Sequence, residues 1–228
     1  MKPGSLYLVA TPIGNLEDIT HRAVETLKAA DVIAAEDTRH TKILLGRYGI
    51  AGARMTPFHS HNIDRQTPVL VAELLEGKNV ALVSDAGTPG VSDPGAVLVK
   101  AAVEKGITVY PIPGAAAPVL AVTASGFPSH RFVFEGFLPR KKGRKTLFDS
   151  WRGEPRTIVF FESPQRIIKT LREIHGVLGE RKVCVARELT KKFEEFIRGG
   201  IAEVANELES RPSVKGEITV VIAPENFR

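Results

Sequence analysis

The chain has 228 residues, of which 43% are hydrophobic and 25% charged, and its formal net charge is +5. This ordinary globular composition excludes a collagen-like or disordered chain and fits one large or two small domains. A single cysteine excludes a disulfide framework and a cysteine-rich zinc module. Four prolines interrupt the longest charge-free stretch, residues 106–129, so it predicts no membrane helix. We expect a soluble, cytoplasmic protein with no membrane partner.

Short apolar runs alternate with amphipathic segments in the first half of the chain. Continuous runs rich in Val, Ile, Leu and Ala are typical of strands buried on both faces of a parallel sheet. We expect such strands at Ser5–Ala10, Asp31–Glu36, Asn79–Asp85 and Ile107–Ile112. Asp18–Ala30 has the apolar stripe of a helix. A further helix is expected to begin at Asp93–Pro94, an N-cap residue followed by proline.

The second half of the chain has a different order of predicted strands and helices. Strands are expected at Phe132–Phe137, Thr157–Glu162, Lys182–Glu188, Glu195–Arg198 and Glu217–Ala223. Some of them follow one another without room for a crossover helix, which predicts a mixed sheet. Ser163–Pro164 is expected to cap a helix. We therefore predict two α/β lobes, residues 1–116 with a mostly parallel sheet and residues 117–228 with a mixed one.

The common nucleotide-binding and metal-binding motifs are missing from the sequence. It contains no G-x-G and no Walker loop, which excludes the usual dinucleotide and phosphate fingerprints. His59 and His61 could share one face of a strand, but no third ligand stands at metal spacing. We expect no metal site.

Three turn-rich loops follow predicted strands, at residues 10–16, 84–95 and 111–117. Glycine lets a main chain approach a ligand closely, and proline keeps such a loop rigid. Any one loop is explained as well by a plain strand-to-helix turn. Three of them at the ends of neighbouring strands predict a small-molecule cleft. Asp85 lies at a strand end, where a carboxylate can accept hydrogen bonds from a ribose or an amine.

Charged residues gather at two further places. Glu36, Asp37, Arg39 and His40 leave a predicted strand together, and such charges are costly to bury unless they are paired. The alternative is that Asp37 or Thr38 caps a helix while Arg39 is solvated. The stretch His130–Arg152 holds seven basic and two acidic residues, which indicates a polyanionic partner or else a solvated surface. Its densest part is Arg140, Lys141, Lys142, Arg144 and Lys145.

Seven segments occur together and in order: ATPIGNLEDIT, AEDTRHT, SDAGTPGVSDPG, FEGFLPRK, FFESPQRI, RELTKKFEE and a late KGE. As a set they resemble the tetrapyrrole methylase family over essentially the whole chain. The resemblance implies two α/β lobes with S-adenosylmethionine in the cleft between them, and a homodimer. It also implies 2′-O-methylation of a cytidine in the decoding region of 16S rRNA in the small ribosomal subunit.

The position of each motif implies a set of cofactor-binding residues. From the first lobe these are Pro12, Gly14, Asp85, Gly87, Thr88, Gly90, Val91, Pro113, Gly114, Ala115 and Ala116. From the second lobe they are Phe161, Glu162, Lys215, Gly216 and Glu217. The missing G-x-G is expected in this family, which binds the cofactor without the usual glycine loop.

A ribose hydroxyl is a weak nucleophile, so a general base can assist the loss of its proton. The candidate acids are Glu36, Asp37, Glu162 and Glu188, and Arg39 or Lys191 could hold a phosphate or lower the pKa of the hydroxyl. We rank Glu36, Asp37 and Arg39 first because they leave a strand near the predicted cleft. Arg140, Lys141, Lys142, Arg144 and Lys145 are the predicted RNA-binding residues.

Two other functions remain open at this point. One is methylation of a tetrapyrrole or corrinoid precursor, which is also polyanionic. The other is a non-catalytic RNA-binding module, for which aromatic residues interleaved with basic ones are the expected mark. Phe132, Phe134, Phe137 and Trp151 fit that mark weakly, since their spacing suits a core equally well. The full motif set and the basic stretch favour the RNA methyltransferase.

Overall fold

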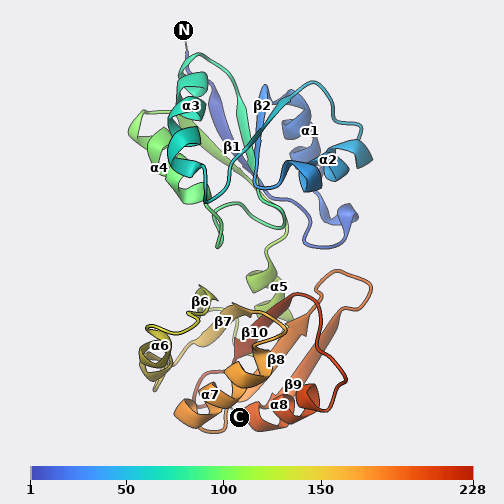
Figure 1. Cartoon of the computed structure of the whole chain (residues 1–228), viewed down its shortest axis with the longest axis vertical. Helices are drawn as coiled ribbons and strands as arrows, with labels where there is room; N and C mark the ends of the chain where they lie inside the picture. The colour runs from blue at the N-terminus through green and yellow to red at the C-terminus, as the bar shows by residue number, and fades with distance from the viewer. Residues whose placement is uncertain (1, 228) are drawn as a thin grey trace. The chain divides into compact units, whose positions relative to one another are not determined.

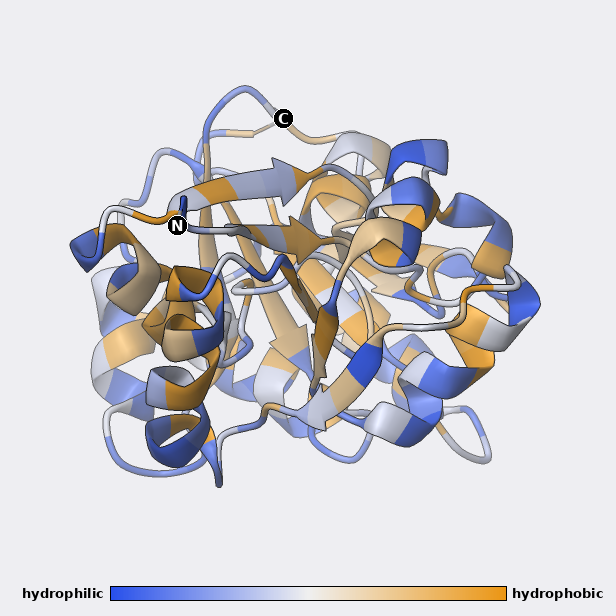
Figure 2. Cartoon of the chain, turned by 90° about the horizontal axis from the view of Figure 1, so that it is seen from above, coloured by the Kyte–Doolittle hydropathy of each residue, from blue (hydrophilic) through white to orange (hydrophobic). Residues whose placement is uncertain are grey.

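The structure is a computed structural model that describes residues 2–227. The chain divides into two compact units, residues 1–116 and 117–228, each with its own sheet (Figure 1). Hydrophobic residues occupy much of the strands, whereas the helices carry both hydrophobic and hydrophilic residues (Figure 2). The predicted fold class, a parallel α/β lobe followed by a mixed one, is confirmed.

The N-terminal lobe has a parallel sheet with strand order β3-β2-β4-β1-β5. Its strands are β1 (Ser5–Val9), β2 (Val32–Ala35), β3 (Arg54–Pro57), β4 (Val80–Val83) and β5 (Thr108–Ile112). Its helices are the 3-10 helix η1 (Leu16–Asp18), α1 (His21–Ala29), α2 (Thr38–Arg47), α3 (Ile63–Leu75) and α4 (Gly95–Glu104). The pair α3 and α4 covers one face of the sheet, and α1 and α2 cover the other (Figure 1).

Local chemistry explains where this lobe departs from the predicted elements. The first long helix begins at His21 rather than at residue 18, because the Thr20 side chain caps it by accepting a hydrogen bond from the Ala23 amide at 3.1 Å. The edge strand β3 was not predicted, since four residues that include an arginine and a proline carry little apolar pattern. Pro57 is tolerated there because an edge strand leaves one side unpaired.

The C-terminal lobe has a mixed sheet with strand order β6-β7-β10-β8-β9, in which only β6 and β7 run parallel. Its strands are β6 (Phe132–Phe137), β7 (Thr157–Glu162), β8 (Lys182–Arg187), β9 (Glu195–Gly200) and β10 (Ile218–Ile222). Its helices are α5 (Ala117–Ala124), α6 (Arg144–Ser150), α7 (Ile167–Leu178) and α8 (Ile201–Glu209). Helix α5 packs against β7 and β10.

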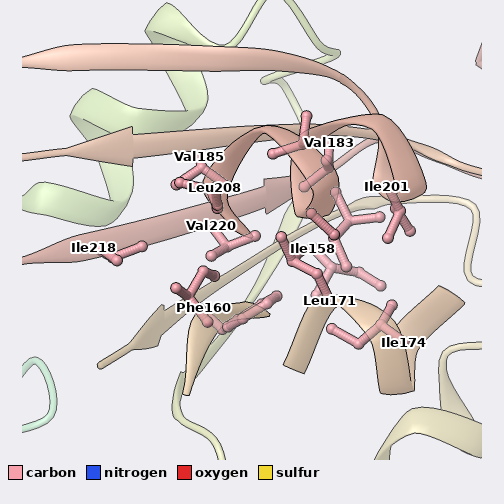
Figure 3. Close-up of a cluster of buried hydrophobic side chains, with 14 of the residues drawn as sticks. Ile158, Phe160, Leu171, Ile174, Val183, Val185, Ile201, Leu208, Ile218 and Val220 are labelled. Carbon is pink, nitrogen blue, oxygen red and sulfur yellow. The ribbon is translucent and has the colours of Figure 1, made fainter. Parts of the chain in front are cut away.

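The central strand of this sheet carries the main core of the lobe. Val220 on β10 pairs with Phe160 on one side and Val185 on the other. Their side chains join Leu171 of α7 and Leu208 of α8 in one buried cluster (Figure 3). The alternation along each strand therefore fixes the face on which α7 and α8 pack.

The carboxylate of Glu162, at the end of β7, has no exposed side-chain surface. It accepts hydrogen bonds from the Ser163 amide and the Thr170 hydroxyl, both at 2.7 Å, and pairs with Arg166 at 2.6 Å. These contacts replace the water that the buried charge has lost. Ser163 was expected to cap α7. Instead its carbonyl accepts from the amides of Arg166 and Ile167, and α7 begins at Ile167.

Arg144 joins α6 to the same network. Its guanidinium donates to Glu173 at 2.6 Å, to the Thr170 hydroxyl at 2.6 Å and to the Pro139 carbonyl at 3.0 Å. One of its nitrogens lies 3.9 Å from Glu162, and the side chain is only 11% exposed. Because α6 has just seven residues, this arginine is a main anchor of the helix.

Replacing this arginine tests the network. Arg144→Met should lower the free energy of unfolding of the C-terminal lobe by about 3 kcal/mol, as expected when one partner of a buried ion pair is lost. Lys145→Met, an exposed position on the same helix, should change it by less than about 0.5 kcal/mol. Urea titration followed by the fluorescence of Trp151, the single tryptophan, measures both. Equal losses for the two variants would contradict the assignment.

Candidate functional site

Three loops meet at the carboxyl edge of the parallel sheet, after β1, β4 and β5, which are neighbouring strands. The amides and carbonyls of Thr11 and Gly87 exchange two hydrogen bonds, at 2.9 and 3.0 Å. The Thr88 hydroxyl donates to the Ala115 carbonyl at 3.0 Å. The segments that hold Pro12 and Gly14, Asp85 to Val91, and Pro113 to Ala116 are therefore joined into one surface.

The glycines of these loops have two different uses. A Cβ on Gly114 would lie 2.8 Å from the Ala10 Cβ, and one on Gly87 would lie 3.3 Å from Ile13. These two glycines let the loops pack on one another, so a side chain there would disturb the loops themselves. Gly90 has a φ of +89°, and a Cβ on it would meet no atom within 4 Å. Gly90 is therefore the position at which the main chain is open to a ligand.

A pocket of about 130 Å³ lies between the first loop, the end of β4 and helix α2. Its wall is largely apolar, with Pro12, Leu16 and Ile43 among the lining residues. Asp85 supplies the one carboxylate of the lining. Its Oδ1 accepts a hydrogen bond from the Asp37 amide at 2.8 Å, and its Oδ2 lies 3.6 Å from His40 Nδ1. The Asp85 side chain is 36% exposed, so its carboxylate can still accept from a ligand.

Asp37 caps helix α2. Its Oδ1 accepts the Arg39 amide at 2.8 Å, and the Arg39 guanidinium binds both carboxylate oxygens, at 2.6 to 3.2 Å. The hydrogen bonds from the Arg39 side chain and amide hold the pKa of Asp37 well below its usual range. A carboxylate this acidic and this fully engaged is a weak proton acceptor. The structure thus gives Asp37 the capping role that the sequence left as the alternative.

Glu36 is less engaged than its neighbour. Its Oε2 accepts from the Asp85 amide at 3.4 Å, a long contact, and the residue is half-buried beside Ser84 and Asp93. Of the two carboxylates among the first-ranked catalytic candidates, that of Glu36 is therefore the freer. The Arg39 side chain is 86% exposed beyond its contact with Asp37.

Asp93 is a site residue that the sequence interpretation missed. It was expected to cap α4, but that helix begins at Gly95 with Pro94 before it. Asp93 instead lines, with Glu36 and Ser84, a cavity of about 10 Å³, roughly the space of one water. Its Oδ2 is buried and has no hydrogen-bond partner in the described structure. Ser92 just before it has a φ of 68°, a strained value for a residue other than glycine.

The environment of Asp93 changes its acidity. Burial and the charges of Glu36 and Asp85 raise its pKa to about 6, although a hydrogen bond with Ser84 opposes the change. The only hint in the sequence was that SDAG and SDPG place two Ser-Asp pairs in one loop. Which of the two aspartates would be buried depends on packing that the sequence does not display.

The second-lobe residues that the motifs implied fall into separate groups within that lobe. Phe161 packs against Phe134 and Phe137, with ring centroids 5.1 and 5.2 Å apart, and Phe137 is 63% exposed. Glu162 is committed to the buried network described above. It is therefore unsuited to be a cofactor ligand or a general base, contrary to its prediction.

The segment Lys215–Glu217 lies just before β10 and contacts Glu188 and Lys191 in the loop that follows β8. A Cβ on Gly216, whose φ is +92°, would lie 2.5 Å from the Glu188 side chain, and the Glu217 amide donates to Glu188 Oε1 at 2.9 Å. Lys191 pairs with Glu188 at 2.9 Å and with Glu217 at 3.2 Å. Partial burial acts to raise the pKa of Glu188, but the hydrogen bonds from Glu217 and Lys191 lower it. Glu188 and Lys191 therefore neutralise each other.

The basic stretch is also divided by the structure. Arg140, Lys141, Lys142 and Lys145 are exposed, whereas Arg144 is held in the network with Glu162 and Glu173. We therefore remove Arg144 from the set of free RNA-binding cations. Among residues 2–227, no group of three or more potential metal ligands of the His, Cys, Asp and Glu types is found, and no helix is long and apolar enough to span a bilayer.

Two solved methyltransferases have the same fold as this chain. The methyltransferase CobJ matches 99% of this chain with 96% of its own, at 20% identity and a TM-score of 0.72. Uroporphyrin-III C-methyltransferase from Thermus thermophilus, complexed with S-adenosylhomocysteine, matches 96% of this chain with 97% of its own, at 20% identity and a TM-score of 0.66. These likenesses show the fold of this chain, an α/β fold of two lobes.

The sequence comparison is more specific. Residues 5–205 match the sequence profile of the tetrapyrrole (corrin/porphyrin) methylases. The chain belongs to this family, as its motifs predicted, and is a methyltransferase.

Similar curated relatives are named ribosomal RNA small subunit methyltransferase I. The relative from Mesorhizobium japonicum is 52% identical over 96% of this chain and 75% of its own length. The relative from Thermotoga maritima is 49% identical over 96% of this chain and 98% of its own length. The relative from Escherichia coli O157:H7 is 50% identical over 96% of this chain and 77% of its own length.

The raised pKa of Asp93 predicts a pH-dependent loss of stability. In the unfolded chain this carboxyl ionises near its ordinary pKa of 3.8, and in the folded chain near 6. As pH rises through this window, the unfolded state releases its proton first, so this group lowers the free energy of unfolding. Asp93→Asn has no proton to release. Its melting temperature relative to wild type should therefore be higher at pH 7.5 than at pH 4.5.

Thermal unfolding at the two pH values measures this difference. Asp64→Asn, an exposed aspartate on α3, is the matched control and should show the same offset from wild type at both. A constant offset for Asp93→Asn as well would mean that this carboxyl ionises normally in the folded protein.

Proposed function

We propose that this chain is a cytoplasmic, S-adenosylmethionine-dependent methyltransferase that modifies 16S rRNA of the small ribosomal subunit. We further propose that it methylates the 2′-oxygen of a cytidine in the decoding region, and that it acts as a homodimer. The observation that carries the proposal is the identity of about half of all residues, over 96% of the chain, with relatives named for small-subunit rRNA methylation.

The loop surface of the N-terminal lobe fits S-adenosylmethionine. The Asp85 carboxylate can accept hydrogen bonds from ribose hydroxyls or from an amine, and Gly90 leaves the main chain accessible. Pro12, Leu16 and Ile43 supply an apolar wall suited to an adenine. When bound, the sulfonium supplies a methyl group that is already electrophilic. The task of the protein is therefore chiefly to position a ribose oxygen in line with that methyl group.

Proton removal from the ribose hydroxyl is the other task. We propose Glu36 as the acceptor, because its carboxylate is less engaged than that of Asp37. Asp37 holds the start of α2 and fixes Arg39, whose exposed guanidinium is placed to meet a phosphate of the RNA. The exposed cations Arg140, Lys141 and Lys145, which line one groove, form the proposed RNA-binding surface of the C-terminal lobe, and Lys142 beside them does not line that groove.

Asp85 provides a direct test of the cofactor site. Asp85→Asn keeps an oxygen that can accept from the Asp37 amide, but it removes the charge that strengthens hydrogen bonds from a ligand. It should weaken binding of S-adenosylhomocysteine, measured by calorimetry, at least tenfold, or about 1.4 kcal/mol. Asp64→Asn is again the matched control and should bind like wild type. Unchanged affinity in a folded Asp85→Asn protein would remove this carboxylate from the site.

Substitutions at Glu36 and Asp37 distinguish the residue that accepts the proton from the residue that caps helix α2. Glu36→Gln should slow single-turnover methyl transfer by roughly 10²- to 10⁴-fold, the range lost with a positioned general base. Asp37→Asn keeps an oxygen for the Arg39 amide and should stay within a few-fold of wild type. Both should bind S-adenosylhomocysteine normally. The reverse order of rates would make Asp37 the acceptor.

The substrate itself is tested with small ribosomal subunits from cells that lack this protein. Methyl transfer from tritiated S-adenosylmethionine is followed with the subunits alone and with a tetrapyrrole precursor as competitor. Mass mapping of the 16S rRNA then locates the methyl group. Label in the tetrapyrrole and none in the RNA would favour the other candidate function. Sedimentation equilibrium tests the homodimer.

A further inference from the structure

A groove of about 450 Å³ runs beside helices α6 and α7 in the C-terminal lobe, and no step of the chemistry proposed above uses it. Its volume lies within the range of pockets that hold small organic ligands. Three exposed cations, Arg140, Lys141 and Lys145, contribute to its lining. The neighbouring Lys142 is exposed as well but does not line it.

Charge in the groove is strongly unbalanced. Glu173 is its acidic lining residue, and Arg144 already pairs with it at 2.6 Å. The positive charges of Arg140, Lys141 and Lys145 are thus left without an acid in the groove to balance them. Their mutual repulsion is relieved when an anion binds. The groove therefore favours a ligand that carries negative charge.

The inner part of the groove is apolar. Phe148, Gly176 and Val177 line it, and the guanidinium of Arg144 lies 4.8 Å from the centre of the Phe148 ring. Hydrogen bonds to Glu173, Thr170 and Pro139 fix that guanidinium in place. We call Phe148, Gly176 and Val177 the floor of the groove. A simple anion gains no binding energy from an apolar floor. A flat base can stack on a fixed guanidinium plane or lie against apolar side chains.

Gly176 deepens the groove. It lies inside α7, where glycine is one of the least favourable residues for helix stability. Its φ is not positive, and a Cβ on it would meet no atom within 4 Å, so nothing in the backbone or in the packing requires a glycine. What the missing side chain provides is room in the groove.

We propose that this groove binds one unpaired nucleotide of single-stranded RNA, with its phosphate at Arg140, Lys141 and Lys145 and its base on the floor beside Gly176. This rests on the proposed rRNA substrate and assigns part of its docking to a defined site. An unpaired nucleotide is required because a base within a duplex cannot enter a pocket.

Fluorescence anisotropy with a labelled ten-nucleotide oligocytidylate, at three salt concentrations, tests the groove. Lys141→Gln and Lys145→Gln should each raise the dissociation constant at least threefold, and the salt slope should fall by at most roughly 0.7, the share of the one phosphate held in the groove. Lys142→Gln removes the same charge from the same run but lies outside the groove, so it should change affinity less than twofold. Equal losses in all three variants would mean a diffuse positive surface and would overturn the proposal.

Gly176→Leu fills the groove without changing the charge. It should raise the dissociation constant at least fivefold while leaving the salt slope unchanged, a combination that a purely electrostatic surface cannot produce. Unaltered binding in a folded Gly176→Leu protein would overturn the proposal. If this variant fails to fold, the comparison of the lysine variants decides alone.

Two further measurements separate this inference from the proposed function. Cytidine 5′-monophosphate should displace the oligonucleotide at lower concentration than inorganic phosphate does, and equal potency would overturn the role of the floor. S-adenosylhomocysteine binding should be normal in every variant. If wild-type protein transfers no methyl group to small subunits, the proposed function fails. If it does, and the groove variants bind RNA like Lys142→Gln, only the groove fails.

Discussion

A carboxylate with no exposed surface ties together β7, α7 and α6 of the C-terminal lobe. The charge of Glu162 is supported by the Ser163 amide, the Thr170 hydroxyl and Arg166, so the end of β7 and the start of α7 have to stay together. Arg144 reaches the same Thr170 from α6. Once that arginine is fixed, α6 is fixed with it, and Lys141 and Lys145 are left at the edge of the groove. A buried charge thus determines which cations remain free.

The N-terminal lobe faces the opposite electrostatic problem, because its loops bring several carboxylates together. Asp37 is balanced by Arg39, and Asp85 accepts an amide hydrogen bond and lies near His40. In the described structure the buried Oδ2 of Asp93 has neither a basic partner nor a hydrogen-bond donor, and the pKa of Asp93 is raised. Repulsion among the acids is therefore relieved by protonation at one position. This leaves Glu36 and Asp85, the acids proposed to act on substrate and cofactor, beside a carboxyl that holds its proton up to about pH 6.

Sequence patterns predicted the sheets and the converging loops, because both follow from local composition. Val80–Val83 is apolar throughout, and glycine and proline mark the loops after β1, β4 and β5. Burial of single charged residues was not predictable. Arg144 and Lys145 are neighbours in one basic run, yet only the arginine turns inward to Glu173. Likewise Glu162 lies at the end of a strand, in the FFESPQRI motif, where a ligand-binding acid is expected. Only the packing of α6 and α7 shows that its carboxylate already binds Thr170, Arg166 and Arg144.

Two proteins with this fold can act on different molecules because the sheet and its loops set only the shared part of the reaction. At 20% identity, CobJ retains the fold at a TM-score of 0.72, so few of the residues on its surface need be the same. Function resides in sites carried by a fold rather than in the fold itself. On the function proposed here, the loops of the N-terminal lobe hold the methyl donor. The choice of an RNA substrate then has to come from elsewhere. On the further inference proposed above, the cationic groove beside α6 and α7 contributes part of it, at a distance in sequence from the loops of the N-terminal lobe.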